Sequence, residues 1–122
     1  MHRDIKPQNI LVERLENSSL ILYKLADFGI SKLVGKKFLM TVNEGFTPQY
    51  SSIEQLKMEP ASPAFDIWSA GMIFYELING VRPYEINSRY VDVKEIFKNE
   101  RKELMTDDKE AIKMVNLMLE KD

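Results

Sequence analysis

Three residues with chemical capacity lie in a short polar stretch at the start of the sequence, His2 to Asn9. Asp4 offers a carboxylate, Lys6 a cation and Asn9 an amide oxygen. A carboxylate can orient a hydroxyl group, a lysine can neutralise a moving anion, and amide oxygens suit hard cations such as Mg²⁺. This combination favours chemistry on phosphate groups, although a His-Arg-Asp triplet alone could equally be a helix cap or a surface turn.

A second candidate motif, Asp27-Phe28-Gly29, follows the apolar run from Leu20 to Leu25 after a single alanine. Its aspartate is another oxygen ligand for a hard cation. The alternative is a turn that ends a strand, because Asp and Gly are common turn residues. Its position downstream of the first motif favours a functional role.

Together the two motifs resemble the catalytic loop and the magnesium-binding motif of eukaryotic-type protein kinases. The resemblance implies that Asp4 lies near the attacking hydroxyl and that Lys6 neutralises charge on the transferred phosphate. It implies that Asn9 and Asp27 bind Mg²⁺ at the ATP phosphates. The residues expected to contact ATP are Lys6, Asn9, Leu11 and Asp27. The interval from Asp4 to Asp27 is long for this family, and we interpret the surplus near residues 13–19 as a lengthened hairpin turn.

A third motif, residues 47–54, resembles the end of the kinase activation loop, where Ser52-Ile53-Glu54 replaces the usual Ala-Pro-Glu. The loss of proline frees a backbone dihedral angle and adds an N–H donor. The resemblance implies that Thr47 positions the substrate by contacting the catalytic Asp and Lys. It also implies a supporting role for Glu54, whose usual arginine partner is not found in the sequence.

A fourth motif begins at Asp66 and resembles the start of the central helix of the kinase lower lobe. There the aspartate hydrogen-bonds the catalytic-loop backbone, which satisfies a carboxylate that would be costly to bury alone. The alternative is an N-cap aspartate, and both roles can hold together.

Substrate specificity and regulation also follow from the resemblance. Lys6 and Thr47 favour a serine/threonine kinase over a tyrosine kinase. Arg3, directly before the catalytic Asp, implies control by a phosphate on the activation loop. Thr41 is the first candidate acceptor, ahead of Ser31, and the alternative is that Thr41 is an ordinary loop residue.

Five apolar or aromatic positions match the two internal spines of the family. His2 and Phe28 match the regulatory spine, whereas Leu11, Ile73 and Leu77 match the catalytic spine around the adenine. From periodicity alone, these five are expected to be core residues.

These residues need elements to position them, and the sequence indicates a mainly α-helical chain with one hairpin. Two apolar runs, 10–12 and 20–25, predict two strands joined by a turn. Residues 29–50 predict a long loop. Residues 66–79 predict a helix buried on all sides, ended by Gly80. Weaker patterns predict helices over 88–100 and after Asp107, where Asp107 and Glu110 resemble a capping box.

The composition limits the class of protein. The 122 residues are 44% hydrophobic and 30% charged, with a formal net charge of −2 and no cysteine. These values predict a globular domain without disulfides or thiolate metal sites, and they give no general field for nucleic acid. Without a long apolar run or a signal peptide, we expect an intracellular, cytoplasmic protein that does not bind a membrane.

The resemblance implies the lower lobe of a protein kinase domain, which is mainly α-helical within an α+β family. Residues 1–122 are expected to form part of that domain, from the catalytic loop to the penultimate helices of the lobe. The Gly-rich phosphate loop, the strand lysine and the adenine hinge of kinases are not found in the sequence. Two hypotheses follow. The chain is a piece of a serine/threonine kinase that uses ATP and Mg²⁺ on protein substrates, or it is a non-catalytic kinase-like binding module. The sequence does not indicate an oligomeric state.

Overall fold

The computed structural model describes residues 1–28, 46–86, 92–98 and 100–120. In these residues the chain is mainly helical with one two-stranded sheet, as the sequence predicts. The elements in order are η1 (Pro7–Asn9), β1 (Ile10–Arg14), β2 (Ile21–Leu25), η2 (Pro48–Tyr50), α1 (Ile53–Leu56), α2 (Ala64–Asn79), α3 (Val93–Ile96) and α4 (Lys109–Met118). Thr41 and Ser31, the candidate phosphate acceptors, lie outside the described residues.

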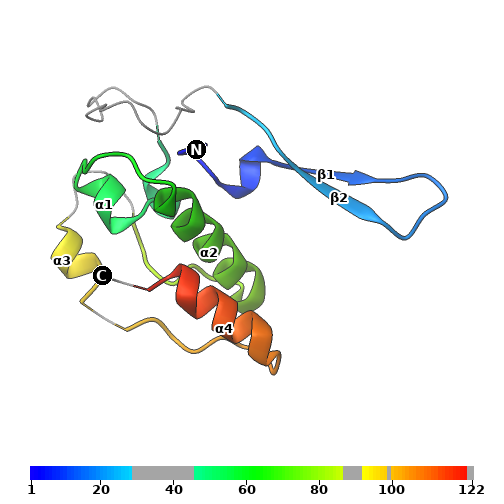
Figure 1. Cartoon of the computed structure of the whole chain (residues 1–122). Coiled ribbons are helices and arrows are strands. Elements are labelled where there is room, and N and C mark those ends of the chain that lie inside the picture. Colours follow the sequence, from blue (N-terminus) through cyan, green and yellow to red (C-terminus); the bar gives the residue numbers. More distant parts are fainter. Residues whose placement is uncertain (29–45, 87–91, 99, 121–122) are drawn as a thin grey trace.

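Strands β1 and β2 form the predicted antiparallel hairpin, which extends away from the helices (Figure 1). The register pairs Val12 with Tyr23 and Glu13 with Leu22. The turn between the strands contains Asn17, whose φ of 58° lies in the left-handed region that Asn tolerates better than most residues. The strands carry many exposed apolar side chains, and Leu11 is 54% exposed. The prediction that Leu11 belongs to the core is therefore wrong for this structure.

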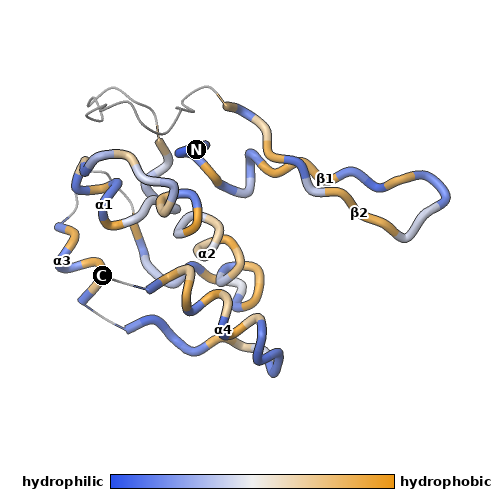
Figure 2. The backbone as a smooth tube through the Cα atoms, viewed as in Figure 1, coloured by the Kyte–Doolittle hydropathy of each residue, from blue (hydrophilic) through white to orange (hydrophobic). Residues whose placement is uncertain are grey.

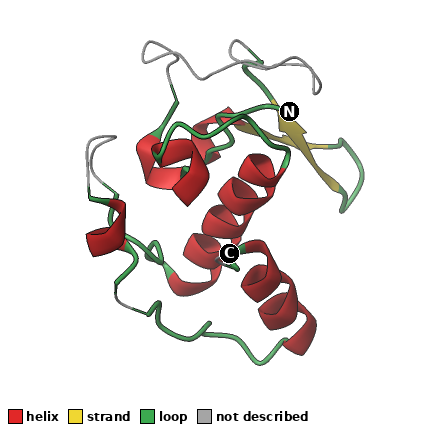
Figure 3. Cartoon of the chain, turned by 60° about the vertical axis from the view of Figure 1, so that its left-hand side comes forward, coloured by secondary structure: helices red, strands yellow, loops and turns green. Residues whose placement is uncertain are grey.

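Helix α2 lies between α1 and α4 (Figures 1 and 3). It begins at Ala64, two residues before the predicted start, and Pro63 occupies the N-cap position. Asp66 is therefore in the first turn, and its interpretation as an N-cap is wrong. The helix ends at Asn79, and its C-cap Gly80 has a φ of 71°, the left-handed conformation that glycine favours after a helix.

Only part of the surface of α2 is buried, which corrects the prediction of a helix buried on all sides. Phe65, Trp68, Met72 and Tyr75 lie in the core. Ile67, Phe74 and Leu77 are exposed, and Leu77 is 75% exposed. Apolar composition indicates that a surface can be buried, but burial also requires a neighbouring element to cover it. Among the described elements, α4 and η2 pack against α2, and apolar segments lie along both α2 and α4 in Figure 2.

The core between α2 and α4 depends on a small residue. A Cβ atom built on Gly71 would lie 2.8 Å from Met118 Cβ and 3.0 Å from Leu119 Cδ2. Glycine therefore allows a closer approach of the two helices than alanine would. Val115 of α4 and Leu119, the C-cap residue of this helix, are fully buried.

The two remaining predicted helices differ in detail from the structure. Within the predicted helix 88–100, the structure describes the short helix α3, Val93–Ile96. Residues 87–91 and 99 lie outside the described ranges. The N-cap of α4 is Asp108 instead of Asp107, and its carboxylate accepts hydrogen bonds from the amides of Glu110 and Ala111. Among the described residues, none of the helices has the length and apolarity needed to cross a membrane.

Candidate active site

The backbone of residues 2 and 3 is anchored by α2. Both amide N–H groups donate to the carboxylate of Asp66, from His2 to Oδ2 and from Arg3 to Oδ1, each at 2.7 Å. Short bonds to a charged acceptor are stronger than neutral ones. The first turn of α2 therefore fixes the chain just before Asp4, which is the geometry that the resemblance implies for Asp66.

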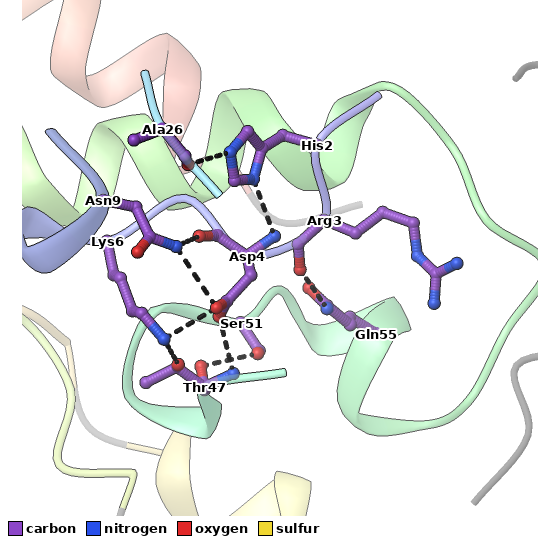
Figure 4. Close-up of polar contacts among 9 residues, drawn as sticks. All are labelled: His2, Arg3, Asp4, Lys6, Asn9, Ala26, Thr47, Ser51 and Gln55. Atoms are coloured by element: carbon purple, nitrogen blue, oxygen red, sulfur yellow. Dashed lines mark hydrogen bonds and ion pairs between the residues drawn. The ribbon is translucent and has the colours of Figure 1, made fainter. Parts of the chain in front are cut away.

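Polar groups surround the Asp4 carboxylate (Figure 4). Lys6 Nζ lies 2.7 Å from Asp4 Oδ2, and the Thr47 amide donates to Oδ1 at 3.0 Å. Lys6 Nζ also donates to the Thr47 hydroxyl at 2.8 Å. The Asn9 amide nitrogen donates to the Asp4 carbonyl at 2.9 Å. The structure therefore brings together four residues that the sequence analysis selected, although Thr47 lies 43 positions from Asp4.

The environment keeps Asp4 ionised. Burial raises the pKa of this carboxyl, but the Lys6 ammonium and the hydrogen bonds from Lys6 and Thr47 outweigh burial, and the net pKa is lowered. A carboxylate with a lowered pKa is a weak base. Asp4 is therefore better suited to accept and orient a hydroxyl than to remove its proton early in a reaction.

A second set of contacts places Asp27 beside this loop. The Ala26 amide donates to the Asn9 carbonyl at 2.8 Å, and the Ala26 carbonyl lies 2.9 Å from His2 Nε2. Because a carbonyl only accepts, Nε2 carries the proton, and Nδ1 can accept from the Asp4 amide at 3.4 Å. These bonds hold the residue before Asp27 against the backbone of Asn9.

Phe28 contacts His2 but is not a core residue. The two rings lie 4.8 Å apart between centroids, and Phe28 is 61% exposed. The prediction of burial is therefore wrong for Phe28, as it is for Leu11 and Leu77, and it is confirmed for His2 and Ile73.

A model of the protein kinase domain matches the chain over residues 1–122. The chain belongs to the protein kinase family. Its relatives include a probable serine/threonine-protein kinase nek1 of Dictyostelium discoideum, 37% identical over 70% of this chain and 20% of the relative. Another is the serine/threonine-protein kinase TIO of Arabidopsis thaliana, 35% identical over 81% of this chain and 7% of the relative.

The fold is also that of a solved kinase. The structure of the Cydia pomonella granulovirus kinase PK-1 matches 97% of this chain with a TM-score of 0.72 and 26% identity. The match covers 42% of the viral chain. This kinase chain therefore spans less than half of that structure and a small part of the relatives named above.

The side chains of three described site residues, Leu11, Glu54 and Arg3, are not part of the Asp4 cluster. Leu11 lies on β1 of the hairpin. Glu54 lies in α1 and is half-buried, and among the described residues the ion pairs do not include it. Thr41 is outside the described residues, and Arg3 is 2% exposed with its side chain directed away from the Asp4 carboxylate (Figure 4). Control of Arg3 by a phosphate on Thr41 stays a prediction.

Sequence reasoning missed two contacts that fix the segment around Thr47. The Gln55 side chain donates to the Arg3 carbonyl at 3.0 Å. The Tyr50 hydroxyl donates to the Glu76 carboxylate at 2.7 Å and so connects η2 to α2. Both contacts join residues far apart in the chain, and neither has a local sequence signal.

The Tyr50–Glu76 bond predicts a change of stability at alkaline pH. Burial, together with the hydrogen bond to Glu76, raises the pKa of Tyr50 from 10.0 to about 12. The stabilisation is therefore complete below pH 10 and is lost as the pH rises towards 12. We expect Tyr50→Phe to lower the free energy of unfolding by about 2 kcal/mol at pH 8, and the difference from the unmodified protein to shrink above pH 10.

Urea unfolding at several pH values measures this difference. Tyr23→Phe is the control, because it removes the hydroxyl of a tyrosine that is 69% exposed. A cost of Tyr50→Phe that stays constant from pH 8 to pH 12 would contradict the assigned hydrogen bond.

Proposed function

We propose that this chain carries the phosphoryl-transfer residues of a serine/threonine protein kinase, which moves the γ-phosphoryl group of ATP to hydroxyl groups of protein substrates. The observation that supports this most strongly is the Asp4 carboxylate held between Lys6 Nζ and the Thr47 amide. Its relatives are serine/threonine kinases by name. In this proposal Asp4, Lys6 and Asn9 are the catalytic residues.

Each catalytic residue has a role that its contacts support. Asp4 accepts a hydrogen bond from the substrate hydroxyl and orients it. Its lowered pKa suits this role, because phosphoryl transfer depends on positioning and electrostatic stabilisation more than on a strong base. Lys6, 2.7 Å from Asp4 Oδ2, supplies positive charge beside the transferred group.

The residues present fit a magnesium ion shared with nucleotide phosphates. The Asn9 amide nitrogen is used by Asp4, which leaves its oxygen as the ligand atom, and Asp27 supplies a carboxylate. Within the described residues there is no cluster of three or more His, Cys, Asp or Glu side chains that could hold a metal alone. Two protein oxygen ligands fit the usual coordination of Mg²⁺, which takes its remaining ligands from phosphate and water. When bound, the ion would neutralise phosphate charge.

Further contacts support the substrate classes. Thr47 Oγ1 accepts from Lys6 at 2.8 Å, and this pair would lie beside a serine or threonine hydroxyl. The exposed side chain of Leu11 on β1 is accessible to an adenine ring. Glu54 and Asp66 serve as supporting residues, and Arg3 and Thr41 as regulatory ones.

We further propose that residues 1–122 form a kinase lower lobe without the lobe that grips the nucleotide. The match to 42% of the viral kinase supports this. ATP then has few contacts, so we expect negligible transfer by the 122-residue chain. A non-catalytic binding module is the alternative.

Transfer of radiolabelled phosphate from ATP to a generic basic protein tests both parts. We expect no transfer by the 122-residue chain, and transfer by the longest natural polypeptide that contains it. In that polypeptide Asp4→Asn should reduce the rate at least ~100-fold. Gln8→Ala is the matched control, since Gln8 is an exposed neighbour in the same loop.

Two results would count against these proposals. Robust transfer by the 122-residue chain, abolished by Asp4→Asn, would show that no further lobe is needed. A folded longer polypeptide that binds a partner but transfers no phosphate would favour the binding module.

A further inference from the structure

The residue before Asp4 has an unfavourable backbone conformation. Arg3 has a φ of 75°, in the left-handed region that costs a non-glycine residue free energy. Such a conformation persists when surrounding contacts over-determine it. The contacts that hold Arg3 therefore decide the direction in which the chain enters Asp4.

Both backbone polar groups of Arg3 are held by buried or half-buried side chains. Its N–H donates to Asp66 at 2.7 Å, and its carbonyl accepts from Gln55 Nε2 at 3.0 Å. The Arg3 carbonyl belongs to the peptide unit that joins Arg3 to Asp4. Gln55 therefore bonds directly to the peptide group of the proposed catalytic residue (Figure 4).

Gln55 is placed for this contact with little freedom. It is 1% exposed, and a buried side-chain amide is costly unless it is hydrogen-bonded. Gln55 lies in α1, and the side chain of the N-cap residue Ser52 accepts a hydrogen bond from the backbone N–H of Gln55 at 3.2 Å. An apolar side chain could fill the same buried space without a hydrogen bond. The bond to the Arg3 carbonyl therefore accounts for the presence of an amide at this position.

We infer that Gln55 is a positioning residue, which holds Arg3 in its left-handed conformation and thereby aims Asp4. The same segment also reaches Asp4 through the Thr47 amide, so residues 47–55 bond both to the Arg3–Asp4 peptide and to the Asp4 carboxylate. A shift of this segment would release the Asp4 carboxylate and the Asp4 backbone together. This inference deepens the proposed function and rests on it for the role of Asp4.

Hydrogen exchange and NMR spectra of the 122-residue chain test the inference without an activity assay. Gln55→Met keeps the volume and removes the donor. In this variant we expect the backbone amides of Arg3 and His2 to exchange hydrogen about ten-fold faster, an increase larger than that of the α2 amides. We also expect the NMR resonance of the Arg3 carbonyl carbon to shift. Tyr75→Phe is the matched control, because Tyr75 is also 1% exposed and donates to a backbone carbonyl, that of Lys102, at 2.9 Å.

A second pair of variants separates positioning from general stability. Glycine adopts a positive φ without strain, so in an Arg3→Gly background Gln55→Met should have a smaller effect on the His2 amide. In the unmodified chain the Gln55 side-chain amide protons should exchange slowly, which needs no variant. Equal acceleration across all amides, or Gln55 amide protons that exchange at the solvent rate, would overturn the inference.

Activity adds a separate readout. In the longer natural polypeptide, Gln55→Met should lower kcat and leave KM for ATP nearly unchanged. If that polypeptide proves inactive, the proposed function fails while the exchange measurements still decide the role of Gln55.

Discussion

Replacement of Asp66 by alanine should lower the free energy of unfolding by about 4 kcal/mol, the largest effect that we expect from a single polar substitution. The carboxylate accepts two 2.7 Å hydrogen bonds from the amides of His2 and Arg3. Each bond to a charged group contributes roughly 1.5–3 kcal/mol. The substitution also leaves two N–H groups of buried residues without an acceptor, which adds a desolvation cost.

Chemical denaturation of the 122-residue chain measures this loss. The control is Asp92→Ala, which removes an exposed carboxylate that also accepts a backbone amide, from Lys94 at 2.9 Å, and should cost about 1 kcal/mol. If the two substitutions cost the same, Asp66 is no more than a helix-end residue and the backbone of residues 2–4 is held by other contacts.

Two substitutions within α2 should differ sharply. Met72 is fully buried and Leu77 is 75% exposed, so Met72→Ala should cost about 3 kcal/mol and Leu77→Ala less than about 0.5 kcal/mol. The helix propensities of Met, Leu and Ala are similar enough that burial decides the outcome. The comparison is therefore a direct test of which side of α2 faces the core.

Thermal or urea unfolding of both variants provides the measurement. A cost above about 2 kcal/mol for Leu77→Ala would mean that this side of α2 is covered, as the sequence pattern alone predicts. Equal small costs for both variants would mean that the core between α2 and α4 is poorly formed.

Local patterns predicted the elements of this fold well. The hairpin follows from two apolar runs around a polar turn, and Gly80 correctly ends α2. Capping was less certain, because Asp107 and Asp108 are adjacent and only the backbone geometry selects Asp108. Burial was predicted least well, since the exposure of Leu77 depends on which elements cover α2.

The site was predicted in part. Motif spacing selected Asp4, Lys6, Asn9 and Thr47, which the structure brings into one cluster. Gln55 was missed because a glutamine in a helix is common and gives no signal of a particular contact. Its hydrogen-bond partner lies 52 positions away in the chain. The positive φ of Arg3 has no local signal either, because it is imposed by Asp66 and Gln55 together.

The contacts of Asp66 also bear on the order in which the protein folds. They join residues 63 and 64 positions apart, and the bond from Thr47 to Asp4 spans 43. Each requires closure of a long chain loop before any stabilisation is gained, whereas the hairpin and the helices form from near neighbours. We therefore expect the arrangement around Asp4 to form late in folding, and an intermediate that holds only local structure would lack the cluster of Asp4, Lys6 and Thr47.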